Sequence, residues 1–187
     1  MPLQGLGRRR FKLDASCVLY LPLYELDGAL FRSKDAYGHL ATVTGALWTP
    51  QGRTFNGTSD FISAGNAAPL NTLAGAFSVE VWYKPTNVTQ SNKGILSKGD
   101  VAAAQTPTSF AMWEAGSLMG FCVYDDANDA RIGYAPTTFP TAGVWYHLVG
   151  TYDGGITVAS ANIFANGALL ALENDQTGGA FASMTTS

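Results

Sequence analysis

Two strand-like segments that each end in a tight-turn dipeptide limit the fold more than any other feature of the sequence. Residues 144–152 are rich in β-branched and aromatic side chains and lead into Asp153-Gly154. Residues 163–165 lead into Asn166-Gly167, and Asn-Gly is the strongest short-range signal of a β-hairpin. Together the two segments predict strands that are closed by short turns.

Short segments of the same kind recur along the chain. The cleanest covers residues 77–84, where alternate side chains point to opposite faces of a strand. No window of about twelve residues has the 3.6-residue period of a helix, and only one helical turn is expected, within 64–75. Strands are predicted at residues 17–21, 23–26, 40–48, 53–55, 61–63, 77–84, 94–98, 110–114, 118–124, 131–134, 144–152, 156–164 and 169–172. This series predicts an all-β fold, a two-sheet antiparallel jelly-roll sandwich with little helix.

The composition fits one domain, predicted over 15–187, preceded by an extended arm at 1–14. Charged residues are 13% of the chain, about half the usual share, and the net charge is −3. This argues against nucleic acid as a partner, because phosphate binding needs a clustered basic surface. The apolar run 17–23 is too short to span a membrane. The basic cluster Arg8, Arg9 and Arg10 is expected to be solvated or to dock on an acidic neighbour in an assembly.

Five segments, taken in their order along the chain, carry a family resemblance. They are residues 19–23, 35–39, 53–62, 77–82 and 145–154, and the last is the most recognisable. In this order they resemble laminin-G-like, concanavalin-A-like jelly rolls over roughly residues 17–175. The resemblance implies a scaffold used mostly for binding and packing, in which only some branches of the family carry catalysis.

The end of the chain departs from that resemblance. Such domains continue past the Asn-Gly hairpin to a last strand that returns beside the first one, whereas this sequence stops at Ser187. The closing strands are therefore expected to be missing, shortened or supplied elsewhere. Because an unpaired sheet edge promotes association, we expect the arm or a neighbouring subunit to cover it. The expected partners are a second copy of the chain or other subunits of an assembly.

The sequence lacks the residue patterns of the enzymes that share such folds. Glycoside hydrolysis needs two carboxylates about 5–9 Å apart, which two acids at alternate positions of one strand could supply. Glu80 and Glu114 have no acidic neighbour at that spacing. There are only two histidines, no Gly-x-Ser-x-Gly turn, and no closely spaced zinc ligands. The prediction is a protein without enzymatic activity.

Calcium is the metal best suited to the acidic loops of the sequence, because it accepts carboxylates together with loop carbonyls. Asp35, in the segment that precedes Gly38, resembles a position at which some relatives hold a structural ion. Asp125, Asp126 and Asp129 form the densest acidic loop. The alternative interpretation is that Asp and Asn are present only because they favour turns.

Glycan binding needs an exposed aromatic platform with a few polar groups. The candidate residues are Trp82 with Glu80, Trp145 with His147, and Trp113. Because side chains alternate along a strand, Trp145 and His147 point to one face and the more apolar row of the same strand points to the other. The face of Trp145 and His147 is therefore a candidate for an open surface. The alternative is that the tryptophans lie in the core, which large aromatic side chains dominate in sandwiches.

Two functions remain open from the sequence. The first is a structural virion protein, such as a capsid decoration or tail subunit, made in the host cytoplasm. Its support is a start at Met1 without a visible signal peptide, the low charge, and an arm and open edge suited to contacts between subunits. The second is a carbohydrate-binding or adhesion module of an extracellular protein, which rests on analogy with the family.

Overall fold

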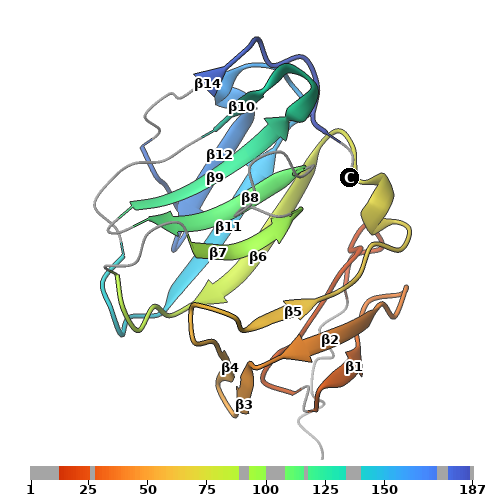
Figure 1. Ribbon diagram of the computed structural model, residues 1–187, viewed down its shortest axis with the longest axis vertical. Helices are drawn as coiled ribbons and strands as arrows, with labels where there is room; N and C mark the ends of the chain where they lie inside the picture. The colour runs from red at the N-terminus through yellow and green to blue at the C-terminus, as the bar shows by residue number, and fades with distance from the viewer. Residues whose placement is uncertain are drawn as a thin grey trace, which may run out of the picture. The chain divides into compact units, whose positions relative to one another are not determined.

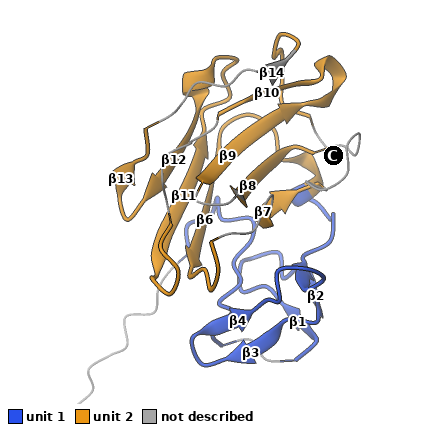
Figure 2. Cartoon of the chain, turned by 60° about the vertical axis from the view of Figure 1, so that its left-hand side comes forward, with its two compact units in different colours: residues 1–70 blue, residues 71–187 orange. Residues whose placement is uncertain are grey.

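The computed structural model divides into two compact units, residues 1–70 and 71–187 (Figure 2). It describes residues 13–25, 28–88, 93–99, 108–115, 118–133, 140–171 and 177–185. The basic cluster Arg8, Arg9 and Arg10 lies outside these residues, so its predicted role in assembly stays a prediction. The boundary falls within a single 3₁₀ turn, η1 (Leu70–Thr72), where the sequence predicts one helical turn.

The first unit is a small antiparallel sheet with a separate hairpin. The sheet has the order β1-β2-β5, formed by β1 (Leu30–Arg32), β2 (Leu40–Thr44) and β5 (Phe61–Ser63). The hairpin pairs β3 (Leu47–Thr49) with β4 (Gly52–Thr54). Phe31 and Ala41 are buried on one face of the sheet, and Leu21, Leu23, Val43 and Ile62 pack against them.

The strands predicted at 17–21 and 23–26 are not formed in the described residues of this region. Pro22 has no N–H for a ladder, and its carbonyl accepts a hydrogen bond from the Glu25 N–H, which makes a turn instead. The Tyr20 carbonyl accepts the Lys34 N–H at 2.9 Å, and the Val18 carbonyl lies 3.0 Å from His39 Nε2. Loop contacts therefore satisfy this backbone in place of a neighbouring strand.

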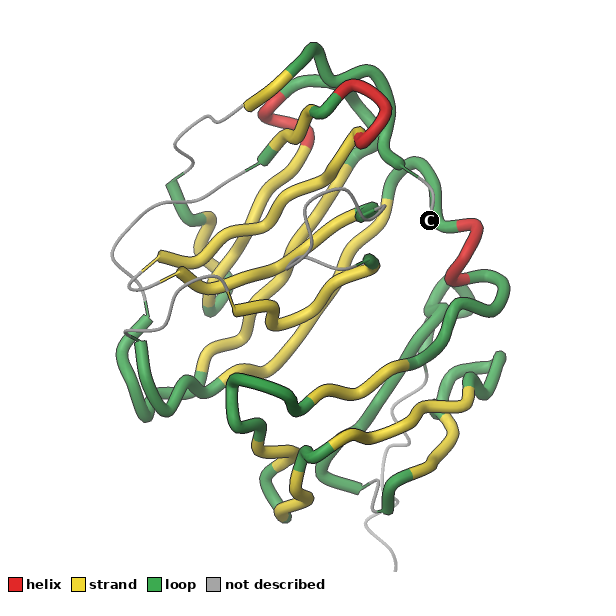
Figure 3. The backbone as a smooth tube through the Cα atoms, in the orientation of Figure 1, coloured by secondary structure: helices red, strands yellow, loops and turns green. Residues whose placement is uncertain are grey.

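The second unit contains two antiparallel sheets (Figure 1). One has the order β13-β12-β11-β6, from β6 (Phe77–Tyr83), β11 (Tyr146–Tyr152), β12 (Ala161–Ala165) and β13 (Ala168–Leu169). The other has the order β14-β10-β9-β8-β7, from β7 (Lys93–Lys98), β8 (Phe110–Ala115), β9 (Leu118–Asp125), β10 (Ala130–Ile132) and β14 (Thr177–Gly178). The other helical segments among the described residues are two short 3₁₀ turns, η2 (Asp126–Asn128) and η3 (Val158–Ser160) (Figure 3). The all-β sandwich predicted from the sequence is confirmed.

Period-two alternation builds the core between these two sheets. In β11, Tyr146, Leu148 and Tyr152 are buried, and they pack in one cluster with Phe121 of β9. Burying a side chain such as Leu148 contributes about 1.5–3 kcal/mol to folding. The row includes Gly150, because the Phe121 ring lies where a side chain would be: a Cβ on Gly150 would approach it to 2.6 Å.

The predicted Asn-Gly hairpin is confirmed between β12 and β13. Asn166 has φ 51° and Gly167 has φ 82°, so both residues adopt the positive φ that a two-residue hairpin turn requires. Asn166 also joins the turn to β11, because its N–H donates to the His147 carbonyl at 2.8 Å. The strand before the turn starts later than the predicted residue 156, since η3 precedes it.

The C-terminal residues pack onto the second unit. Phe181 and Met184 are buried in its core, although the segment forms no strand. The N–H groups of Ala182 and Ser183 donate to one carboxylate oxygen of Asp125 at 2.8 and 3.1 Å. Before this segment, β14 pairs antiparallel with β10, and the expectation about the closing strands stays a prediction.

Candidate functional site

The four-stranded sheet has an outer face that points away from the core. Alternation places every second residue of β6, β11 and β12 on it, and β13 extends it at one side. Its members are Ser78, Glu80, Trp82, His147, Val149, Thr151, Asn162, Phe164 and Leu169. These residues together are called the outer face.

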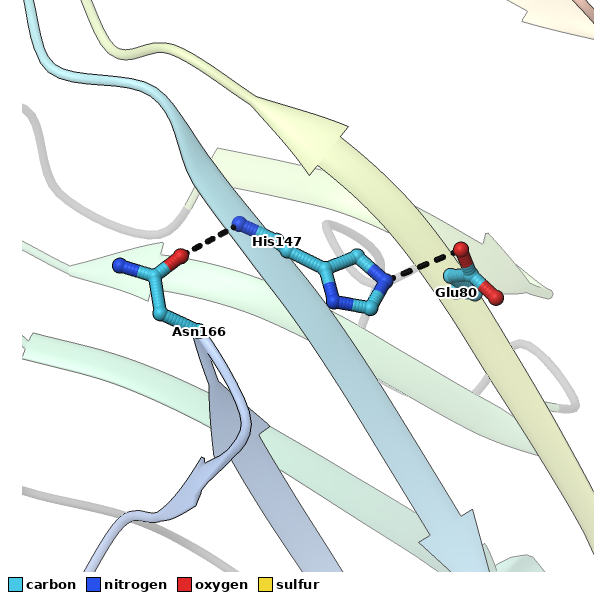
Figure 4. A network of polar contacts seen from close by, with 3 residues as sticks. All are labelled: Glu80, His147 and Asn166. Carbon is cyan, nitrogen blue, oxygen red and sulfur yellow. Dashed lines mark hydrogen bonds and ion pairs between the residues drawn. The ribbon is translucent and has the colours of Figure 1, made fainter.

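The centre of the candidate site is a contact between Trp82, His147 and Glu80. Trp82 and His147 lie opposite each other on β6 and β11, and their rings stack with centroids 5.0 Å apart. The Trp82 side chain is nevertheless 64% exposed. His147 Nε2 lies 2.9 Å from Glu80 Oε1 (Figure 4). That distance fits an ion pair when the His147 ring is protonated, and Nε2 has no aligned hydrogen-bond partner.

The hairpin turn after β12 holds the backbone of His147 in place. The His147 N–H donates to Asn166 Oδ1 at 2.9 Å (Figure 4), and the Asn166 N–H donates to the His147 carbonyl. Both backbone groups of His147 are therefore bound to one residue. The sequence predicts Asn166 as a turn residue directly after a strand, and its bonds to His147 follow only from the pairing of β11 with β12.

Further aromatic and apolar side chains extend the site. Trp145 precedes β11, is 41% exposed, and has the Lys84 ammonium 5.9 Å from its ring centroid. Across the sheet, Val149 is opposite Phe164, which in turn is opposite the exposed Leu169. The sequence alone does not indicate these last three residues, since only strand register places them in one row across the sheet with Glu80.

This arrangement is suited to holding a flat ligand with an apolar surface. An exposed indole offers a large rigid contact area, and the carboxylate of Glu80, 65% exposed, can accept hydrogen bonds from hydroxyl groups. The alternative prediction that these tryptophans lie in the core is wrong for Trp82 and Trp145.

The third candidate tryptophan lies elsewhere. Trp113 belongs to β8 in the five-stranded sheet and is half-buried. Its ring covers Gly120 on β9, where an added Cβ would lie 2.6 Å from Cζ2 of the ring. The glycan-binding role predicted for Trp113 therefore cannot share the outer face, which belongs to the other sheet.

The Asp35 carboxylate organises a loop of the first unit. Oδ1 accepts the N–H groups of Tyr37 and Gly38, and Oδ2 accepts that of Tyr20 at 2.9 Å. Burial raises the pKa of Asp35, but these bonds and one from Ser33 outweigh it, so the pKa is lowered. The turn-forming role weighed against calcium is confirmed here, and calcium at Asp35 stays a prediction.

The acidic loop after β9 is also organised by hydrogen bonds. Asp125 is 2% exposed and accepts the Asn128 N–H and side-chain amide, besides the two C-terminal N–H groups. Asp126 Oδ2 accepts the Thr108 N–H at 2.8 Å, and Asp129 adopts φ 49° at the end of η2. In the part of the chain that the structure describes, no three His, Cys, Asp or Glu side chains gather around a possible metal position. Calcium at this loop likewise stays a prediction.

The two strand glutamates do not form a catalytic pair. Glu80 lies on the outer face, whereas Glu114 is 2% exposed and sits in the core of the second unit, where the Tyr83 hydroxyl donates to its Oε2. Burial raises the pKa of Glu114, although the hydrogen bond from Tyr83 opposes the shift. Cys17 and Cys122 are not joined by a disulfide; Cys122 is buried and Cys17 is partly buried.

Comparison with known proteins gives one family match. A family model described as the concanavalin A-like lectin/glucanases superfamily matches residues 56–184. The match starts before β5 and includes all strands of the second unit. A search of curated proteins found no match. Among the described residues, no helix has the length and apolar character needed to span a membrane.

Proposed function

Because the chain belongs to the concanavalin A-like lectin/glucanases superfamily, we propose that it binds carbohydrate, without cleaving it, on the outer face of its four-stranded sheet. Membership makes the protein a binding or structural jelly-roll module. Domains of the laminin-G-like and lectin-like kind are typically non-catalytic. The finer assignment rests on the residues of the outer face.

The observation that carries the proposal is the exposure of Trp82. An indole that is 64% exposed on the outer face of a sheet is not held there by core burial. It lies beside an acceptor, Glu80, and against a second ring, His147. Stacking on Trp82 would cover the apolar side of a pyranose, while Glu80 would accept bonds from its hydroxyl groups.

The test combines a glycan array with titration of the best ligand. We expect selective binding, and Trp82→Ala should weaken it at least about tenfold, as loss of a central tryptophan does in binding sites. Trp48→Ala is the matched control, because Trp48 is a 40% exposed tryptophan of the first unit. Absence of selective binding, or equal losses in both variants, would contradict the proposal.

Non-catalytic binding can be tested with the same ligand. Prolonged incubation of the protein with a bound oligosaccharide should leave its chain length unchanged, because no second acid lies beside Glu80 among the described residues of the outer face. Chromatography of the sugar measures this. Release of shorter products that Glu80→Gln abolishes would overturn this part of the proposal.

A virion-associated role, as a capsid decoration or tail subunit, is the second candidate. One structural observation favours it: β6 is the last strand of its sheet in the described part of the chain, and such an edge suits contacts between subunits. The corresponding localisation would be the virion, against an extracellular one for the carbohydrate-binding module. The genes beside this one separate the two: capsid and portal genes favour the virion, and export and polysaccharide genes favour the extracellular role.

A further inference from the structure

The outward backbone groups of β6 can be identified from the strand register. Asn166 on the β12 side donates to the His147 carbonyl, so the odd-numbered residues of β11 direct their N–H and C=O groups toward β12. The even-numbered residues of β11 therefore form backbone hydrogen bonds with the odd-numbered residues of β6, as Leu148 does with Val81. On β6 this leaves the N–H and C=O groups of Ser78, Glu80 and Trp82 directed away from β11.

These outward groups form a continuous open edge. In the described residues of the second unit, β6 pairs with β11 alone, and no hydrogen bond within this unit engages the outward groups of Ser78, Glu80 or Trp82. The inward row of β6 is only half-buried along its whole length, whereas the inward row of β11 is buried. The core of the second unit is thus less covered beside β6 than one strand further in.

The sequence of β6 has similar types of side chain at most positions when it is read in either direction. The sequence from Phe77 to Tyr83 has an aromatic residue at each end, valine at 79 and 81, and Glu80 in the centre. An antiparallel pair of two such strands about Glu80 would place each Val79 opposite Val81 of the second copy, and each Phe77 opposite Tyr83 of the second copy. Aromatic and β-branched cross-strand pairs of this kind stabilise sheets.

We propose that β6 pairs antiparallel with β6 of a second copy, about a two-fold axis at Glu80, to join two four-stranded sheets into one. A two-fold contact needs a surface that is complementary to itself, which is what the reversed match of side chains provides. In this register every outward N–H of one copy meets an outward C=O of the other. The inward rows of both copies gain a neighbouring strand.

One feature of this register opposes the pairing and also makes it testable. It places the two Glu80 carboxylates opposite each other, and like charges in that position destabilise a sheet pair. Each Glu80 lies 2.9 Å from the His147 imidazole of its own copy. The other charged residue on the same side is Lys84, which directly follows β6. Association of the wild type is therefore expected to be weak and concentration-dependent.

Sedimentation velocity of the full chain, without glycan, tests the proposal from roughly 1 µM to 1 mM, the range of weak association. Glu80→Gln removes the repulsion and should lower the dimer dissociation constant about two- to fivefold. Glu80→Lys should stay monomeric by itself, yet a labelled sample mixed with wild type should form mixed dimers, because opposite charges then face each other. Wild type and Glu80→Gln that both remain monomeric would overturn the proposal, and absence of mixed dimers would overturn the register.

A proline variant tests whether the edge itself is used. Ser78→Pro removes an outward N–H but leaves the bonds between β6 and β11, since proline is tolerated on the open side of an edge strand. It should abolish dimers, whereas Ser78→Ala should not. Circular dichroism confirms that both variants are folded, and a Ser78→Pro protein that is folded and still dimeric would contradict pairing through β6. If Ser78→Pro is unfolded, the Glu80 series alone decides. Because no glycan is present, failure here leaves the proposed carbohydrate binding standing.

Discussion

Replacing Asp125 by alanine would remove the carboxylate that joins the acidic loop to the C-terminal segment. The carboxylate is 2% exposed and accepts four N–H groups, two from Asn128 and one each from Ala182 and Ser183. A hydrogen bond to a charged group contributes about 1.5–3 kcal/mol. Loss of the two bonds from Ala182 and Ser183 alone should therefore lower the free energy of unfolding by about 3 kcal/mol or more.

The loss should be visible both globally and locally. For a chain of 187 residues, 3 kcal/mol corresponds to a fall in Tm of about 6–12 °C, which calorimetry measures. Amide hydrogen exchange should also accelerate at Ala182 and Ser183, whose N–H groups lose their acceptor. Asp129→Asn is the control in the same loop, because asparagine tolerates the positive φ of that residue.

The contribution of the Asp125 carboxylate to stability should also depend on pH. Burial raises the pKa of Asp125, but the hydrogen bonds from Asn128, Ala182 and Ser183 outweigh it, so the folded-state pKa is below the unfolded one. Its stabilising effect is therefore complete above the ordinary aspartate pKa of about 3.9 and is lost as pH falls through the lowered value. The difference between wild type and Asp125→Ala should shrink in acid. A loss below about 1 kcal/mol at neutral pH, or a difference that grows in acid, would refute the reasoning.

Three further substitutions probe the core and the hairpin. Gly150→Ala should lower the free energy of unfolding by about 1–3 kcal/mol in urea melts, because the new methyl would lie 2.6 Å from the Phe121 ring; an unchanged midpoint would mean that the ring moves aside without cost. Glu114→Gln should gain stability relative to wild type as pH rises above the ordinary glutamate pKa of about 4.3, because burial holds the folded-state pKa of Glu114 above its unfolded value and the wild type loses stability as pH rises through that raised pKa. A gain that shrinks with rising pH would contradict this. Asn166→Ala should cost about 1–2 kcal/mol in thermal melts, since alanine is strained at φ 51°, and Asn166→Gly should cost less. Equal losses would show that the side-chain bond of Asn166, rather than its φ, matters.

Local patterns in the sequence were enough to predict most of the second unit. The alternation of residues 77–84 predicts β6 and its buried and exposed sides, and Asn166-Gly167 predicts the turn after β12. Both signals are short-range, because side chains alternate along any strand and two positive φ angles need particular residues. The first unit was harder, since an apolar run at 17–21 resembles a strand whether or not a neighbour is available to pair with it.

The candidate site shows the same division. Glu80, Trp82 and His147 could be proposed from alternation alone, because each lies on the polar side of a recognisable strand. Their contact with one another required the register of β6 against β11, which follows from long-range pairing. The same is true of Phe164 and Leu169. For Asp35 and Asp125 the sequence could not decide between calcium and turn formation, since both uses favour the same residue types.

The Phe121 ring above Gly150 has a consequence for how the two sheets of the second unit can shift. A displacement of one sheet along the other by a single residue pair would drive the ring into the side chain of Leu148 or Tyr152. Because Gly150 has no side chain, it is the position in this row that leaves room for the Phe121 ring, and this fixes the alignment of the two sheets. Substitutions elsewhere between the sheets can change the packing volume, but sliding of the layers is blocked as long as this aromatic ring faces a position without a side chain.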